Sequence, residues 1–103
     1  MDSNLHQAVE IIVKNFEPEK VILFGSRAIG TANQDSDYDL CILKSNLLHK
    51  RKVAQEIYKA LLQIPIPIDI IVETPENFAS LLKNPFLIYG SIAENGEILY
   101  EKQ

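Results

Sequence analysis

Two periodicities of hydrophobic and polar residues divide this chain into helices and strands. Apolar residues recur at helical spacing over residues 4–16, with Ser3 as the expected N-cap and Pro18 just beyond the end. Helical spacing returns over residues 48–62, and Pro65 closes that segment. Both segments are predicted to be amphipathic helices that turn one face toward a core.

Short β-branched runs lie between and after these helices and predict strands. Residues 20–24 and 37–43 are expected to belong to one sheet. Residues 66–73 have apolar side chains on both sides of the chain, as in a strand covered on both faces, and only Asp69 interrupts that pattern. Residues 97–101 are expected to form a final strand or an extended tail.

Thr74 followed by Pro75 is typical of a helix start, with a capping residue and then proline at the first helical position. Pro85 is expected to end this helix, and residues 85–96 are expected to form a further helix that ends at Gly96. The predicted order is helix, strand, strand, helix, strand, helix, helix, strand. With 103 residues and no internal repeat or linker, we expect a single domain over residues 1–103.

Composition narrows the class of protein. Hydrophobic residues at 47% and charged residues at 23% are ordinary for a globular protein, and no segment is apolar enough to cross a membrane. The first ten residues lack the pattern of a signal peptide, so a cytoplasmic location is expected. The net charge of −4 argues against strong nucleic-acid binding. Cys41 is the only cysteine, and its apolar neighbours predict a buried thiol.

Three aspartates in the predicted strands are the main candidates for chemistry. Asp37 and Asp39 are two residues apart on a strand, so their side chains share a face about 7 Å apart. Asp69 joins them if its strand is the neighbouring one. Carboxylates about 4 Å apart repel by roughly 4 kcal/mol, so such a cluster needs protons or a cation, and oxygen ligands favour Mg²⁺ or Mn²⁺. Alternatively, Asp37 belongs to a loop, Asp39 to a solvated edge and Asp69 to a local cap.

A Gly-Ser turn precedes the paired aspartates. Gly25 directly follows a strand, and Ser26 and Arg27 have no strand character, so a tight turn into a short helix is expected. Its free N–H groups could bind phosphate, with the Ser26 hydroxyl and the Arg27 charge beside them. The alternative is an ordinary turn capped by Ser26. A second Gly-Ser pair at residues 90–91 has no paired aspartates after it, so the dipeptide alone is not specific.

The segments "GSRAIG", "SDYDL" and "IDIIV" together resemble the DNA polymerase β-like nucleotidyltransferase superfamily, in its minimal nucleotidyltransferase (MNT) branch. The resemblance covers essentially the whole chain and implies an α+β fold, with a small mixed sheet of about four strands and helices packed on it. It implies that Gly25 and Ser26 hold the nucleotide triphosphate. Asp37 and Asp39 would bind two divalent ions, and Asp69 would complete the site and help to activate the attacking hydroxyl.

The MNT branch contains antitoxin partners of HEPN-domain toxins. The resemblance therefore implies the antitoxin of a type VII HEPN/MNT system, with Mg²⁺ (or Mn²⁺) as cofactor and ATP as substrate. It would transfer AMP to a tyrosine hydroxyl of the cognate HEPN ribonuclease toxin and form a hetero-oligomer with it. Two alternatives remain: a non-catalytic antitoxin that binds its partner stoichiometrically, and a small-molecule transferase of the aminoglycoside-modifying type, whose relatives generally need an extra helical domain.

Three smaller features do not change this interpretation. Ile29 stands where relatives with "GSRARG" carry a second arginine, which weakens any prediction of a phosphate or partner contact there. The basic run at 49–52 is typical of a solvated helix face, although a toxin or RNA contact is the alternative. His6 and His49 are isolated in the sequence, so neither is expected to be catalytic.

Overall fold

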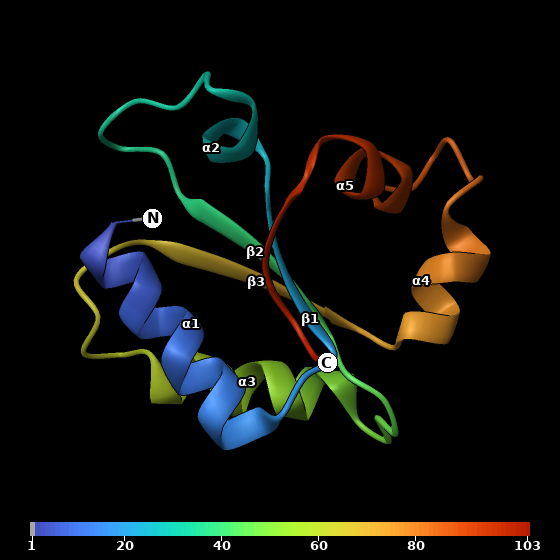
Figure 1. The fold of residues 1–103 in the computed structure, drawn as a ribbon, viewed down its shortest axis with the longest axis horizontal. Helices are drawn as coiled ribbons and strands as arrows, with labels where there is room; N and C mark the ends of the chain where they lie inside the picture. The colour runs from blue at the N-terminus through green and yellow to red at the C-terminus, as the bar shows by residue number, and fades with distance from the viewer. Residues whose placement is uncertain (1) are drawn as a thin grey trace.

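The computed structural model describes residues 2–103, and its four strands form one sheet with helices on both faces (Figure 1). The strands are β1 (Lys20–Phe24), β2 (Tyr38–Leu43), β3 (Ile68–Glu73) and β4 (Glu97–Glu101). The helices are α1 (Ser3–Phe16), α2 (Ser26–Ile29), α3 (Lys50–Ala60), α4 (Pro75–Leu81) and α5 (Tyr89–Asn95). The α+β class and the mixed four-stranded sheet are as predicted.

The sheet has the strand order β3-β2-β1-β4. Strand β1 pairs antiparallel with both β2 and β4, whereas β2 and β3 run parallel. A parallel pair needs a crossover connection, and α3 provides it. The register sets Phe24 opposite Asp39 on one side of β2, and Asp69 opposite Asp39 on the other side.

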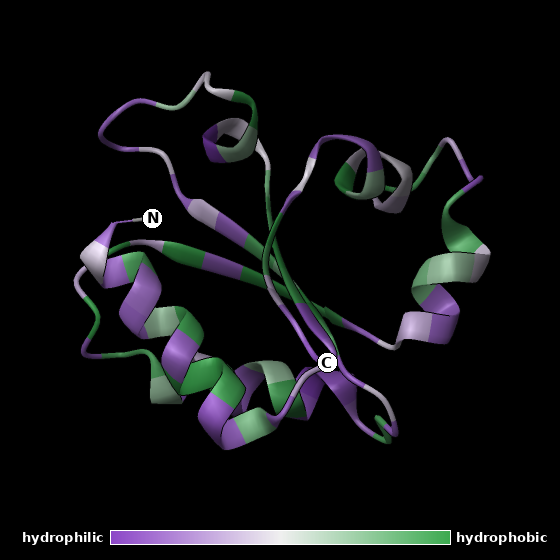
Figure 2. Cartoon of the chain, in the orientation of Figure 1, coloured by the Kyte–Doolittle hydropathy of each residue, from purple (hydrophilic) through white to green (hydrophobic). Residues whose placement is uncertain are grey.

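Strand residues alternate between two hydrophobic layers, because successive side chains of a strand point to opposite faces. One layer joins the sheet to α1 and α3, and the other joins it to α4 and α5. Figure 2 shows the corresponding apolar stretches in the strands and along the helices. Cys41 is fully buried in the second layer, as predicted, and burial followed by the charge of Glu73 raises the pKa of its thiol to about 12.

The helix starts were predicted correctly at α4 and wrongly at α1. Thr74 caps α4, since its hydroxyl accepts the N–H of Asn77 at 3.1 Å. The N-cap of α1 is Asp2 rather than Ser3, which lies inside the helix. Asp2 has extended backbone angles that aim its carboxylate at the N–H of Leu5, 2.8 Å away.

Four elements were predicted to be longer than they are in the structure. Helix α3 is shorter than 48–62 because only its middle packs on the sheet, and Leu48 and Leu62 lie outside it, 90% and 79% exposed. Strands β2 and β3 begin one and two residues later than predicted. Residues 85–88 form turns rather than helix, because Asn84 accepts the N–H of Phe86 at 2.9 Å.

A buried carboxylate ties the two helical layers to the end of β3. Glu73 is 1% exposed, and its Oε1 accepts hydrogen bonds from Lys50 Nζ at 2.9 Å and the Tyr89 hydroxyl at 3.1 Å. Its Oε2 accepts from Thr74 N–H at 3.0 Å and from Asn77 Nδ2 at 3.1 Å. The network therefore satisfies both oxygens and joins α3, α4 and α5 to one strand end.

Within residues 2–103, none of the helices combines the length and the apolar character that a membrane crossing would require. The longest helix, α1, is amphipathic and contributes Leu5, Val9 and Ile12 to the core.

We expect Glu73→Gln to lower the free energy of unfolding by about 1–3 kcal/mol at pH 7, because the amide cannot accept all four hydrogen bonds. Burial acts to raise the pKa of Glu73, but the hydrogen bonds from Lys50, Thr74, Asn77 and Tyr89 outweigh it and hold that pKa below its ordinary value of 4.5. A lowered carboxyl pKa contributes stability above pH 4.5 that is lost as the pH falls below it.

Urea unfolding of both proteins at pH 7 and in steps below pH 4.5 measures this difference. The difference in the free energy of unfolding between wild type and Glu73→Gln should become smaller as the pH falls. Glu76→Gln, at an exposed position in the first turn of α4, is the matched control and should change stability by less than about 0.5 kcal/mol. A gap that stays constant down to low pH would contradict the assigned charge of Glu73.

Candidate active site

Two of the three candidate aspartates face each other across the parallel pair of strands. Asp39 of β2 is the register partner of Asp69 of β3, and residues in register point to the same face of the sheet. Asp39 is half-buried, whereas Asp69 is exposed on the edge strand. The expectation that their strands are neighbours is confirmed.

Asp37 lies in the loop immediately before β2 and is exposed. The alternative that assigned it to a loop is therefore correct for its backbone. It is nevertheless two residues from Asp39, and its charge acts on that residue. The pKa of Asp39 is raised above its ordinary value of 3.8, first by burial and then by the negative charges of Asp69 and Asp37.

The carboxylate of Asp39 has no internal hydrogen-bond donor. Among residues 2–103, no side-chain or backbone donor reaches an oxygen of Asp39 or Asp37. This contrasts with Glu73, whose oxygens accept four hydrogen bonds. A half-buried carboxylate that has no donors and has like charges nearby is stabilised when it binds a proton or a cation.

The three aspartates are chemically suited to bind a hard divalent cation, because Mg²⁺ and Mn²⁺ prefer carboxylate oxygens as ligands. The described side chains have not converged into a coordination sphere: within residues 2–103, no three His, Cys, Asp or Glu side chains are grouped closely enough to hold a metal ion. A cation bound by Asp37, Asp39 and Asp69 would therefore have to draw them closer together.

Gly25 lies directly against the Asp39 carboxylate. Its φ of +73° and ψ of −158° fall in a region that only glycine adopts readily. A Cβ at this position would be 2.2 Å from Asp39 Oδ2. The absence of a side chain at Gly25 therefore lets the turn after β1 lie directly against the Asp39 carboxylate, which occupies the place that a Cβ would need.

Ser26 begins the four-residue helix α2, whose N-cap is Gly25. No side-chain capping hydrogen bond is formed there. The alternative that Ser26 caps the turn is therefore wrong. Within residues 2–103, its hydroxyl takes part in no side-chain hydrogen bond, and the side chain is half-buried.

Arg27 closes the loop between α2 and β2. Its Nε and Nη2 donate to the carbonyl of Ser36 at 3.0 and 2.8 Å, and Nη2 also donates to the carbonyl of Asn33 at 3.3 Å. The guanidinium stacks on Tyr38, 3.8 Å from the ring centroid. Because Ser36 precedes Asp37, Arg27 holds the backbone that presents Asp37. Its predicted role as a nucleotide ligand stays a prediction.

The sequence did not indicate two tyrosines that contact this region. The Tyr38 hydroxyl donates to Asp2 Oδ2 at 2.6 Å and so connects the loop to the cap of α1. The Tyr58 hydroxyl donates to Asp69 Oδ1 at 2.9 Å. Neither contact could be found from spacing, because each joins segments that only the tertiary fold brings together.

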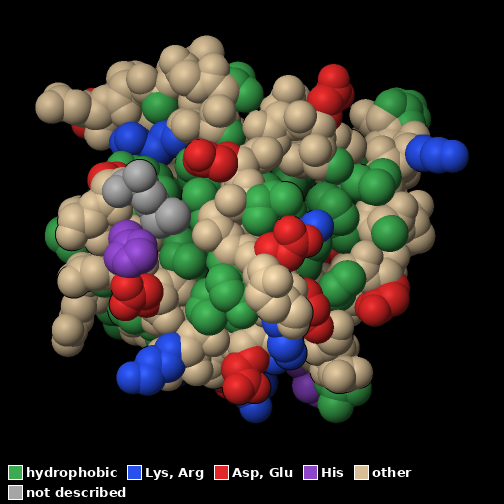
Figure 3. Space-filling view, viewed as in Figure 1, with side chains coloured by type: hydrophobic (Ala, Val, Ile, Leu, Met, Phe, Trp, Pro, Cys, Tyr) green, Lys and Arg blue, Asp and Glu red, His purple; other side chains and the backbone are tan. Residues whose placement is uncertain are grey.

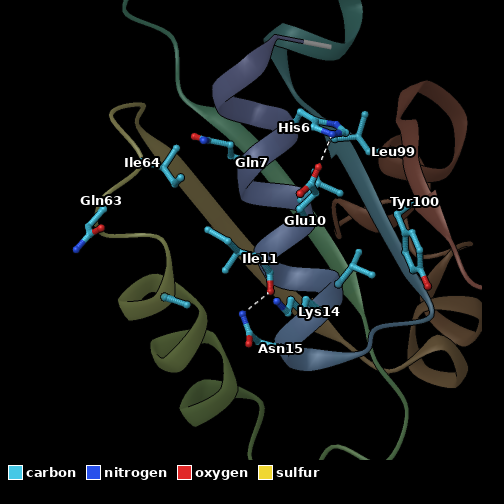
Figure 4. Close-up of a pocket in the computed structure, with 13 residues that line it drawn as sticks. His6, Gln7, Glu10, Ile11, Lys14, Asn15, Gln63, Ile64, Leu99 and Tyr100 are labelled. Carbon is cyan, nitrogen blue, oxygen red and sulfur yellow. Dashed lines mark hydrogen bonds and ion pairs between the residues drawn. The ribbon is translucent and has the colours of Figure 1, made fainter.

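Two hollows of the surface lie away from these residues. A groove of about 1000 Å³ runs between α1, the end of α3 and β4, and Figure 4 shows His6, Glu10, Ile64 and Tyr100 along it. A second hollow of about 420 Å³ lies between β1, α4 and α5. None of the sequence-predicted site residues lines either one. Lys and Arg side chains are scattered over the face in Figure 3, rather than gathered into one basic surface.

Comparison with known proteins agrees with this geometry. The family described as "Polymerase beta, Nucleotidyltransferase" matches residues 6–103. A search of curated proteins found no match. Among solved structures, a Sulfolobus solfataricus protein assigned as a nucleotidyltransferase has a TM-score of 0.68 at 18% identity, covering 96% of this chain and 78% of that one.

Two toxin–antitoxin structures are also similar. One, a complex with AMP-PNP, has a TM-score of 0.58 at 18% identity and covers 99% of this chain and 76% of that one. The other, a mutant of MntA–HpeT, has a TM-score of 0.57 at 19% identity, with the same coverage. At these identities the likeness shows the shared fold alone. The family match over nearly the whole chain shows more: this protein belongs to the polymerase β nucleotidyltransferase family.

Proposed function

We propose that this chain is an Mg²⁺-dependent antitoxin that transfers AMP from ATP to a tyrosine hydroxyl of a cognate HEPN ribonuclease toxin and thereby neutralises it. The observation that carries the proposal is the register pairing of Asp39 with Asp69 beside Gly25, in a chain of the nucleotidyltransferase family. The similar toxin–antitoxin structures, one holding AMP-PNP, support a nucleotide and a protein partner.

The proposed roles follow from position and chemistry. Asp37 and Asp39 hold divalent ions, with Asp69 completing the set. Bound there, such ions stabilise the charge on the attacking and leaving oxygens of an in-line phosphoryl displacement. Because Gly25 has no side chain, the turn after β1 lies directly against Asp39. The Ser26 hydroxyl, next in the chain, donates to a phosphate oxygen of the nucleotide. Within residues 2–103, Arg27 Nη1 is the guanidinium nitrogen without a hydrogen bond, and it is the part of Arg27 proposed to contact the nucleotide.

The bonds and protons of the transfer balance with these groups. The tyrosine oxygen of the partner forms a bond to the α-phosphorus of ATP, and the bond from that phosphorus to the bridging oxygen breaks. Pyrophosphate leaves with the electron pair. Asp69 accepts the proton of the tyrosine hydroxyl, and it is placed for this because it is exposed at the edge strand while Asp39 is half-buried.

Asp39→Asn should lower AMP transfer by about 100-fold or more, because it removes a negative charge that the ions require. Transfer is measured with α-labelled ATP, Mg²⁺ and the protein of the neighbouring gene. The matched control is Asp35→Asn, an exposed loop aspartate whose carboxylate makes no hydrogen bond within residues 2–103; it should transfer normally.

Equal transfer by wild type and Asp39→Asn would contradict the proposed metal site. A cell assay separates the non-catalytic alternative, because Asp37→Asn should then protect cells from the toxin as well as wild type does. Protection that is lost together with label transfer supports catalysis.

Mg²⁺ with ATP should raise the melting temperature, because a ligand that binds only the folded state stabilises it. At ten times the Kd the gain is about 1.4 kcal/mol, or several degrees for a domain of this size. Gly25→Ala should lose this response, because its Cβ would collide with Asp39 Oδ2.

Gly30→Ala is the control for backbone strain. Gly30 also has a positive φ, +81°, but a Cβ there would meet no atom within 4 Å. Both variants should melt below wild type, and only Gly30→Ala should still respond to Mg²⁺ with ATP in a thermal-shift measurement. A full response in Gly25→Ala would show that ligand binding does not need the close contact between Gly25 and Asp39.

A further inference from the structure

Tyr58 reaches from α3 to the free edge of β3, on the strand that carries Asp69. Its hydroxyl donates to Asp69 Oδ1 at 2.9 Å and accepts the N–H of Ile70 at 2.8 Å. The Ile70 N–H is also within 3.1 Å of Asp69 Oδ1. The phenol oxygen thus binds a backbone group and a carboxylate of neighbouring residues at once.

These hydrogen bonds lie at the edge of the sheet, where they have two effects. Strand β3 is an edge strand, so its outward N–H groups have no strand partner. Tyr58 satisfies one of them and holds the side chain of the residue just before it. Asp69 is exposed, and without such a bond its carboxylate would sample several rotamers.

We propose that Tyr58 is a positioning residue for Asp69, an inference that rests on the proposed function. Its hydroxyl fixes Oδ1 and leaves Oδ2, which accepts no hydrogen bond within residues 2–103, as the oxygen that meets the ion and the attacking hydroxyl. Helix α3 thereby sets the orientation of Asp69, which lies on the strand next to that of Asp39.

The direct test is Tyr58→Phe, which removes the hydroxyl and keeps the ring. The expected result is a Kd for Mn²⁺ that is weaker by about 3- to 10-fold, read by electron paramagnetic resonance on the purified chain. With Mg²⁺, kcat for AMP transfer should fall about tenfold while KM for ATP changes by less than twofold. The metal-free melting temperature should stay close to wild type, because the Ile70 N–H keeps Asp69 Oδ1 as an acceptor.

Tyr100→Phe is the matched control. Tyr100 lies on β4 at the opposite edge of the sheet, and its hydroxyl makes no side-chain hydrogen bond within residues 2–103. This variant should retain wild-type Mn²⁺ affinity and kcat. A loss confined to Tyr58→Phe supports positioning, whereas equal losses in both variants would overturn it.

Two further outcomes keep this inference separate from the proposed function. If Asp69→Asn weakens Mn²⁺ binding but Tyr58→Phe does not, the role of Tyr58 is overturned while the metal site remains. If wild type modifies no partner protein yet Tyr58→Phe weakens Mn²⁺ binding, positioning is supported and the proposed acceptor is wrong. AMP found on Tyr58 itself by mass spectrometry would make it an acceptor and overturn the positioning role.

Discussion

The parallel register between β2 and β3 is the constraint on which the rest of the site depends. It sets Asp39 beside Asp69 at one end of the strands and Leu43 beside Glu73 at the other. A shift of one residue would turn Asp69 to the opposite face of the sheet, and Ile70 and Val72 would leave the core beneath α1 and α3. The hydrophobic pattern that fixes the fold therefore also fixes the distance between the two carboxylates.

Strand β3 carries carboxylates at both ends of one face, and their surroundings differ. Glu73 is buried with four hydrogen bonds, so its charge is fully compensated within the protein. Asp39, the register partner of Asp69, is half-buried and has no hydrogen-bond donor among residues 2–103; burial first, and then the charges of Asp69 and Asp37, raise its pKa. Burying a charge without partners is costly, so the Asp39 carboxylate, unlike that of Glu73, would be stabilised by a proton or a cation.

The secondary structure and the pairing of aspartates could be predicted from sequence because both depend on local periodicity. The apolar runs identified the strands of Asp39 and Asp69, whereas Asp37, expected on the strand beside Asp39, lies in the loop before it. The contacts of Arg27 and Tyr58 could not be predicted, since each joins residues nine or more positions apart whose proximity is set by the loop path and by the packing of α3. The end of α3 was misjudged for the same reason: Leu62 fits the helical period, but no part of the sheet lies beneath it.

The exposed position of Ile29 limits what its departure from the related motif can mean. Ile29 ends α2 and is 57% exposed, whereas Arg27 on the same helix is held by the carbonyl of Ser36. A second arginine at position 29 would add charge to the outer surface of this turn without replacing any contact of Arg27. The isoleucine therefore leaves intact the loop that presents Asp37 and the close contact between Gly25 and Asp39. Ile29 instead changes the surface next to the turn, where it presents an apolar side chain to a molecule that approaches the aspartates.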